Sequence, residues 1–284
     1  KNNGVLEITS GNTITANNVT VEDGGNLIQR DGGVLTLPTT GAFNVQKATA
    51  SVPLKYVFWS SPVAAQNIFD IYPSGNQPQY VMTYNTATNF YTQIPNAASN
   101  FSANAGIGYS VKMPTAALTG VNFGGSAKIP NNGNISVPLS IAGNGFNLIG
   151  NPYPSSLSLT DFLTANQANI ASTLWFWDNS GGSVTTQTGS TATNNGYATF
   201  NAAGTGTWVA APNSTSANTT TQLNANGPVA KIGQGFIVKA LTASNASFTN
   251  AMRTATAGNF LNKNVNTEGK YWLKLTTSYG ASLV

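Results

Sequence analysis

The strongest constraint on the fold is an internal echo: GIGYSVKM at residues 106–113 returns as GQGFIVKA at residues 233–240. Three further landmarks occur in the same order around each copy. These pairs are YVFWSSPV (56–63) with NLIGNPYP (147–154), VMTYNTATNFY (81–91) with LWFWDNSGG (174–182), and VNFGG (121–125) with ASFTN (246–250). Because four landmarks share one order, we interpret the chain as a tandem pseudo-repeat of one structural unit.

The amino-acid composition indicates the secondary structure of the repeated unit. Charged residues are only 7% of the 284 residues, and Asn, Thr, Ser and Gly are abundant. Asn, Ser, Thr and Gly weaken helices, whereas Thr, Val and aromatic residues suit strands, and Asn and Gly suit turns. The sequence therefore predicts an all-β protein with little helix, in which the repeats are two tandem β-sandwich-like units.

The first 48 residues have a different rhythm. Short runs rich in β-branched residues alternate with Gly, Asn and Asp turns at close and fairly even intervals. This cadence is typical of a β-solenoid, whose coils stack to bury a continuous apolar row. We expect residues 1–48 to be the end of a longer β-solenoid; two ordinary hairpins are the alternative.

The expected boundaries follow from these two patterns. They are a β-solenoid-like segment at 1–48, a first β-sandwich repeat at 49–141, a second at 142–253 with an insertion at about 183–230, a linker at 254–269, and the start of a C-terminal secretion-signal region at 270–284.

The Gly-x-Gly pairs are not a dinucleotide fingerprint, because that motif opens a helix after a strand and here a strand continues. We expect these glycines to lie where a neighbouring backbone or large ring approaches closely, or where a strand bends. The only expected helix lies within residues 156–170, capped by Thr160, with Asp161 in its first turn.

The residues available for chemistry are few. The chain has no histidine and no cysteine, which excludes Ser-His-Asp and Cys-His triads, thiolate zinc sites and disulfides within it. A carboxylate pair is the remaining option for acid-base catalysis, and Asp70 with Asp161 occupy comparable places after the two proline turns. Capping of a turn or a short helix explains each of them without catalysis.

Other classes of site have weak support as well. Glu22 and Asp23 with Asp31 are the only acidic cluster that suggests calcium, and solvated turn residues are the alternative. Basic residues are scattered without a run, so nucleic-acid binding is not expected. No apolar stretch has the length of a membrane span, and no cofactor is expected.

Aromatic residues form the remaining candidate site. Trp175 and Trp177 alternate with Phe176, so the two tryptophans should share one face of a strand, followed by Asp178. A surface glycan could stack on such a pair of rings. A strand that is buried on both faces explains the same residues without a ligand.

The succession KYVFWSSPV, GIGYSVKMP, NLIGNPYPSSL, LWFWDN, GQGFIVKA and FTNAMR resembles a module of large surface and secreted proteins of gliding Bacteroidetes, found just upstream of a type IX secretion signal domain. The likeness covers nearly all of residues 50–284. The final KYWLKLTTSYGASL resembles the strand that opens the region leading into that signal, which places Tyr271, Trp272, Leu273 and Leu275 on a signal-proximal strand.

The resemblance implies a type IX secretion cargo that crosses the periplasm and outer membrane and is displayed on the cell or released. Its implied partners are the outer-membrane translocon and a shuttle barrel, which recognise a C-terminal signal beyond Val284. The expected function is therefore a non-enzymatic adhesin or motility-related protein. The alternative is a carbohydrate-binding accessory region of a secreted polysaccharide-degrading enzyme.

Overall fold

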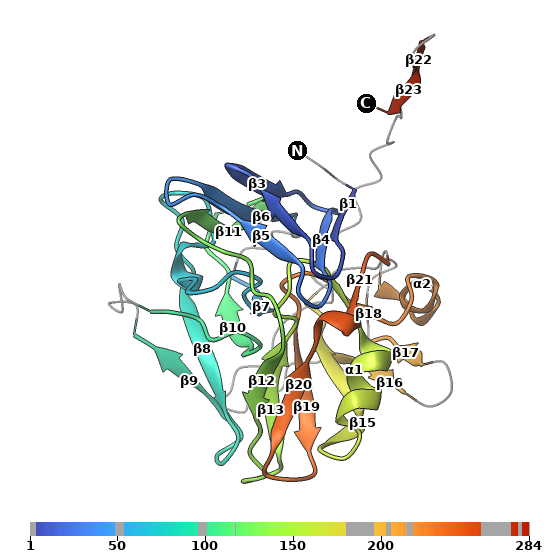
Figure 1. The fold of residues 1–284 in the computed structure, drawn as a ribbon. Coiled ribbons are helices and arrows are strands. Elements are labelled where there is room, and N and C mark those ends of the chain that lie inside the picture. The colour runs from blue at the N-terminus through green and yellow to red at the C-terminus, as the bar shows by residue number, and fades with distance from the viewer. Residues whose placement is uncertain are drawn as a thin grey trace.

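The computed structural model describes residues 4–48, 54–95, 101–116, 118–179, 196–202, 206–212, 214 and 218–256, and the backbone of two strands at 274–277 and 280–283. Strands in several sheets dominate this part of the chain, and helix is confined to short segments, so the all-β expectation is confirmed (Figure 1). In the described residues, no helix is long and apolar enough to cross a membrane.

The N-terminal stack consists of six short strands in two layers. The first layer is β1 (Val5–Ile8), β2 (Thr13–Thr15) and β3 (Asn18–Val21); the second is β4 (Asn26–Gln29), β5 (Val34–Thr36) and β6 (Ala42–Ala48). Each first-layer strand pairs in parallel with one second-layer strand: β1 with β4, β2 with β5, and β3 with β6. Two ordinary hairpins would give antiparallel neighbours, so the hairpin alternative is wrong.

The two layers repeat each other closely. Val5 lies opposite Asn26 and Thr13 opposite Val34, a step of 21 residues in both cases. The corner glycines Gly11 and Gly32 follow the same step and have φ values of 73° and 75°. The third pair has a longer step of 24 residues, since Asn18 lies opposite Ala42, so the backbone path is repeated through the first two strands and the corner between them.

Two larger sheets follow the stack. The first sheet is built from β7 (Tyr56–Trp59), β8 (Tyr80–Asn85), β9 (Phe90–Ile94) and β10 (Tyr109–Lys112), in the order β7-β10-β8-β9. The second sheet is built from β13 (Phe146–Gly150), β15 (Ile170–Trp177), β16 (Tyr197–Asn201), β17 (Thr207–Val209) and β19 (Gly235–Ala240), in the order β13-β19-β15-β16-β17. The strands that echo each other in sequence occupy the same positions in the two sheets, and β17 is an addition to the second.

Each large sheet has a smaller companion. In the first, β11 (Gly120–Ser126) pairs antiparallel with β6; in the second, β20 (Asn245–Phe248) pairs antiparallel with β12 (Ile135–Pro138). The two repeated sets of strands therefore begin with β6 and β12, before the boundaries expected at residues 49 and 142. Below, the first unit means β6–β11, in which β6 is shared with the stack, and the second unit means β12–β20.

The two glycine pairs lie where the units meet. A Cβ on Gly108 would lie 2.7 Å from the carbonyl oxygen of Ile149, and one on Gly235 would lie 2.8 Å from Cβ of Phe58. The amide of Ser60 donates to the carbonyl of Gly233 (2.9 Å), as that of Gly150 donates to Gly106 (2.9 Å). The expectation of close approach is confirmed: Gly108 lies against β13 of the second unit, and Gly235 lies against β7 of the first unit.

An aromatic layer fills the space between the two large sheets. Its buried members are Phe58, Leu148 and Ile237. Half-buried rings pack around them from both sheets, namely Tyr84, Tyr91, Phe146, Trp175, Trp177 and Tyr197. The inner faces of the two sheets therefore face each other across a shared hydrophobic layer.

Arg253 joins the stack to the second unit. It begins β21 (Arg253–Thr254), which pairs with β14 (Ser156–Ser158), and β14 also pairs with β18 (Val229–Ala230). The guanidinium is 2% exposed and donates to the carbonyl of Leu27 (2.7 Å) and to the side-chain oxygens of Asn132 (3.0 Å) and Asn250 (3.1 Å). Burial lowers the pKa of Arg253 to about 9.

The helices differ from the sequence expectation. Helix α1 covers Leu159–Asn166, and its N-cap is Ser158, whose hydroxyl accepts from the amide of Asp161 (3.3 Å), so the expected cap at Thr160 is wrong. Thr160 instead lies within the first turn of the helix. A second helix, α2 (Thr220–Ala225), was not expected, and single 3₁₀ turns occur at Ile68–Asp70 and Asn250–Met252.

Candidate functional site

Strand β15 presents its aromatic residues to two different layers, as the alternation predicts. Phe176 lies in the core of the second unit, whereas Trp175 and Trp177 lie in the aromatic layer between the large sheets. β15 has a neighbour on both edges, because it pairs with β16 and with β19. The tryptophans are therefore held on a central strand.

The surroundings of Trp177 are supplied by the first unit and by β16. Its ring stacks at 29° on Phe58, with centroids 6.1 Å apart, and contacts Tyr197 edge-on at 5.4 Å. Its Nε1 donates to the backbone carbonyl of Tyr56 (3.1 Å). Trp175 makes an edge contact with Phe146 at 5.4 Å. These contacts favour packing of the two units as the role of the rings, since a sugar platform needs open ring faces.

Asp178 lies just after β15 and is 2% exposed. Its carboxylate accepts from the hydroxyl of Ser214 (2.8 Å) and the amide of Asn218 (3.0 Å). Nearby Lys55 donates from its ammonium to the carbonyl of Asn179 (2.6 Å). Burial lowers the pKa of Lys55, and the charge of Asp178 offsets this lowering only in part. No local pattern could have linked Ser214, Asn218 or Lys55 to Asp178, because all three lie far from it in the chain.

The candidate catalytic pair is not brought together in one site. Asp161 lies in the first turn of α1, which packs on the core of the second unit. Asp70 ends a 3₁₀ turn in the first unit and lines a groove of about 750 Å³. Glu22 and Asp23 line the same groove, and Asp31 does not.

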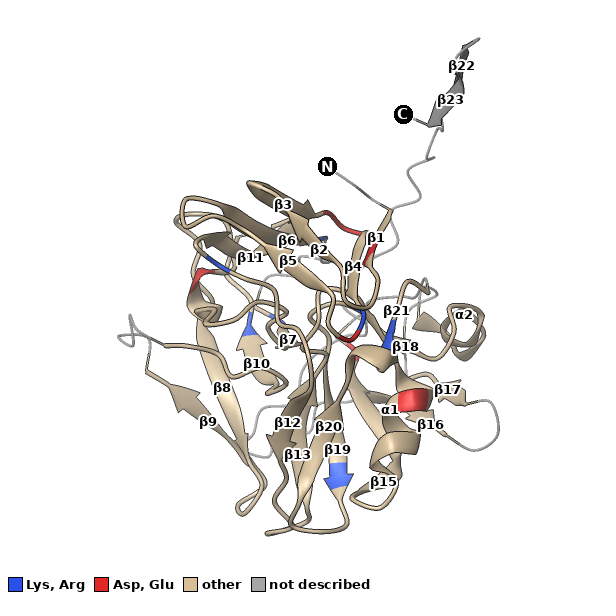
Figure 2. Cartoon of the chain, in the orientation of Figure 1, with Lys and Arg blue, Asp and Glu red and all other residues tan. Residues whose placement is uncertain are grey.

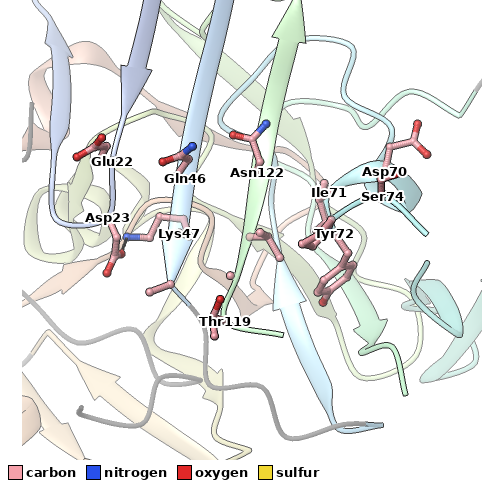
Figure 3. A pocket seen from close by; sticks show the side chains of 14 residues that line it. Glu22, Asp23, Gln46, Lys47, Asp70, Ile71, Tyr72, Ser74, Thr119 and Asn122 are labelled. Atoms are coloured by element: carbon pink, nitrogen blue, oxygen red, sulfur yellow. Dashed lines mark hydrogen bonds and ion pairs between the residues drawn. The ribbon is translucent and has the colours of Figure 1, made fainter. Parts of the chain in front are cut away.

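The groove lies beside β6 and β11 (Figure 3). Lys47 is nearly buried there, and its ammonium contacts the carboxylate of Asp23 at 2.5 Å. Gln46 and Asn122 present amides from the neighbouring strands, while Tyr72 is buried and accepts from Trp59 Nε1 (3.4 Å). Burial raises the pKa of the Tyr72 hydroxyl. Among the described residues, no group of three or more acidic side chains is placed to hold a metal ion.

The signal-proximal strand lies mostly outside the described residues. This applies to Tyr271, Trp272 and Leu273. Leu275 falls within β22 (Lys274–Thr277), opposite Ser282 of β23 (Gly280–Leu283), and the two strands pair antiparallel.

The fold and these sites define a class: an all-β protein in which a parallel-stranded stack is built onto a duplicated, antiparallel two-sheet body. The chain belongs to the family described as "Domain of unknown function (DUF8693)", whose model matches residues 1–283. Comparison with curated proteins and with solved structures found no match.

Proposed function

We propose that this chain is a non-enzymatic structural module of a secreted or cell-surface protein that is exported by type IX secretion. Within it, the N-terminal stack is the end of a β-solenoid and the two units are tandem β-sandwiches. Its place is the cell surface, in an adhesin or motility-related protein, reached through the periplasm and outer membrane. The resemblance described above supports the export route.

The observation that carries the structural role is the junction between the stack and the body. Ile8, Val21 and Leu27 of the stack share one hydrophobic core with Val57 and Phe123 of the first unit. The stack also contacts the second unit, because Leu27 donates to the carbonyl of Pro154 (2.8 Å) and accepts from Arg253. A stack held to both units can transmit force without a flexible hinge, which suits a load-bearing surface module.

The distribution of charge fits the same role. Charged side chains are sparse and dispersed over the described chain (Figure 2). Exposed Asn, Thr and Ser keep such a surface hydrated without charges. The ion pair between Arg30 and Glu7 joins the two layers of the stack at 2.6 Å rather than marking a binding site.

Location and export are tested together in the native cell with a tagged full-length protein. We expect added protease to remove the tag from intact cells, and deletion of the translocon to retain the protein in the periplasm. Affinity purification should recover the translocon barrel and its shuttle. A protein that is protease-protected in intact cells, with the same distribution whether or not the translocon is present, would contradict the proposal.

A further inference from the structure

The first layer of the N-terminal stack has a free strand edge. Among the described residues, β1, β2 and β3 each pair with one strand only, in the second layer. The amide of Asn26 donates to Gly4 and that of Arg30 to Ile8. In a parallel ladder the residues between these bonding positions point the other way, so Val5 and Glu7 direct their backbone groups away from β4.

The apolar row inside the stack is also unfinished at this edge. Leu6, Ile14 and Val19 are only partly buried. Their partners in the second layer are covered far better, with Leu27 and Phe43 at 0% exposure and Leu35 at 9%. An added layer would cover the first row as the first layer covers the second.

The opposite edge of the stack is closed by the body of the protein. β6 pairs with β11, and the backbone of Leu27 bonds to Pro154 and Arg253. The carbonyl of Gly33 accepts from the side chain of Asn132 (3.0 Å). Growth of the stack is therefore possible in one direction only.

We infer that the β1-β2-β3 edge binds one further coil of the same three-strand kind, running parallel and preceding Val5 in the polypeptide. The contact between the existing layers specifies its chemistry. The coil needs aliphatic side chains over Leu6, Ile14 and Val19, and a glycine at the corner beside Gly11. At the existing corner a Cβ on Gly32 would lie 3.3 Å from the amide nitrogen of Gly11, whereas a Cβ on Gly11 meets nothing within 4 Å.

This inference rests on the solenoid interpretation in the proposed function, but it does not depend on export. It is tested on purified protein by placing a second copy of residues 4–24 directly before Gly4, which keeps the 21-residue step of the first two strand pairs. The readout is amide hydrogen exchange of the original β1–β3, together with the thermal unfolding midpoint. The matched control carries the same extension with the copied Leu6, Ile14 and Val19 positions changed to Ser.

We expect the apolar extension to slow exchange of the original first layer by about tenfold or more and to raise the midpoint, because its edge amides become hydrogen-bonded. The Ser extension should do neither. Equal exchange in both extended proteins would overturn the inference. A dimeric parent chain with an already protected first layer would also overturn it, in favour of a second copy as the occupant.

Discussion

A methyl group added to either inter-unit glycine should force the two units apart. Gly108→Ala places Cβ 2.7 Å from the Ile149 carbonyl oxygen and 2.8 Å from Leu148 Cγ, and Gly235→Ala places it 2.8 Å from Phe58 Cβ. Ordinary contact needs about 3.5 Å, so backbone or core must move by roughly 0.7 Å. Neither glycine has a positive φ, so alanine is tolerated by the local backbone.

The magnitude follows from overpacking. Extra methyl groups in a packed core cost about 1–3 kcal/mol, and these clashes include backbone atoms, which places them near the upper end. Alanine restricts the unfolded chain and returns about 0.5 kcal/mol. Each variant should therefore lose about 2 kcal/mol, which lowers the melting temperature by about 4 °C in a chain of this size.

Thermal and guanidinium unfolding measure both effects. Gly75→Ala is the control, since that glycine has φ of 83° with open space around it and should lose only about 1 kcal/mol of backbone strain. Because both clashes are relieved by one separation of the units, the double variant should lose less than the sum of the two singles. Single effects no larger than that of Gly75→Ala, or strict additivity, would refute the packing argument.

Four further predictions concern single features. Trp177→Ala should lower the free energy of unfolding by about 3 kcal/mol, because it removes the ring that stacks on Phe58 in the aromatic layer. A variant that unfolds like the parent chain in denaturant but is no longer retained on a polysaccharide column would instead support the carbohydrate alternative. Asp23→Asn should lower the free energy of unfolding by about 2 kcal/mol, because it removes the carboxylate that pairs with the buried Lys47 ammonium. Glu7→Gln, which breaks the half-exposed ion pair with Arg30, should change it by less than about 0.5 kcal/mol. Urea unfolding of the two variants measures both values. Arg253→Lys should lower the free energy of unfolding by about 2–3 kcal/mol and speed proteolysis of the stack, because an ammonium cannot reach the acceptors of Leu27, Asn132 and Asn250 together. Proteolysis no faster than in the parent chain would contradict this prediction. Burial raises the pKa of Tyr72, Tyr91 and Tyr153. The free energy of unfolding should therefore be unaffected below the unfolded tyrosine pKa of about 10 and should fall as pH rises above it. Absorbance at about 295 nm should show these tyrosines ionising only as circular dichroism reports unfolding, and their ionisation in folded protein would contradict the prediction.

The candidate site shows where sequence reasoning ends. Alternation along one strand was enough to place Trp175 and Trp177 on one face, because that depends on local geometry alone. What covers that face is Phe58, more than a hundred residues away, and no local pattern encodes such a contact. For the same reason Asp70 could be matched to Asp161 in sequence, whereas in space it lies with Glu22 and Asp23.

The sequence by itself determined the all-β class, the repeated order of strands, the two-layer rhythm of the N-terminus and the need for glycine at positions of close approach. These properties follow from side-chain period, turn chemistry and the missing glycine Cβ, all of which act within a few residues. Tertiary structure alone decided that β6 and β12 begin the two units, that Gly108 lies against β13 and Gly235 against β7, and that Arg253 joins the stack to the body. Those outcomes depend on which distant surfaces bury each other, and that choice is made by packing over the whole chain.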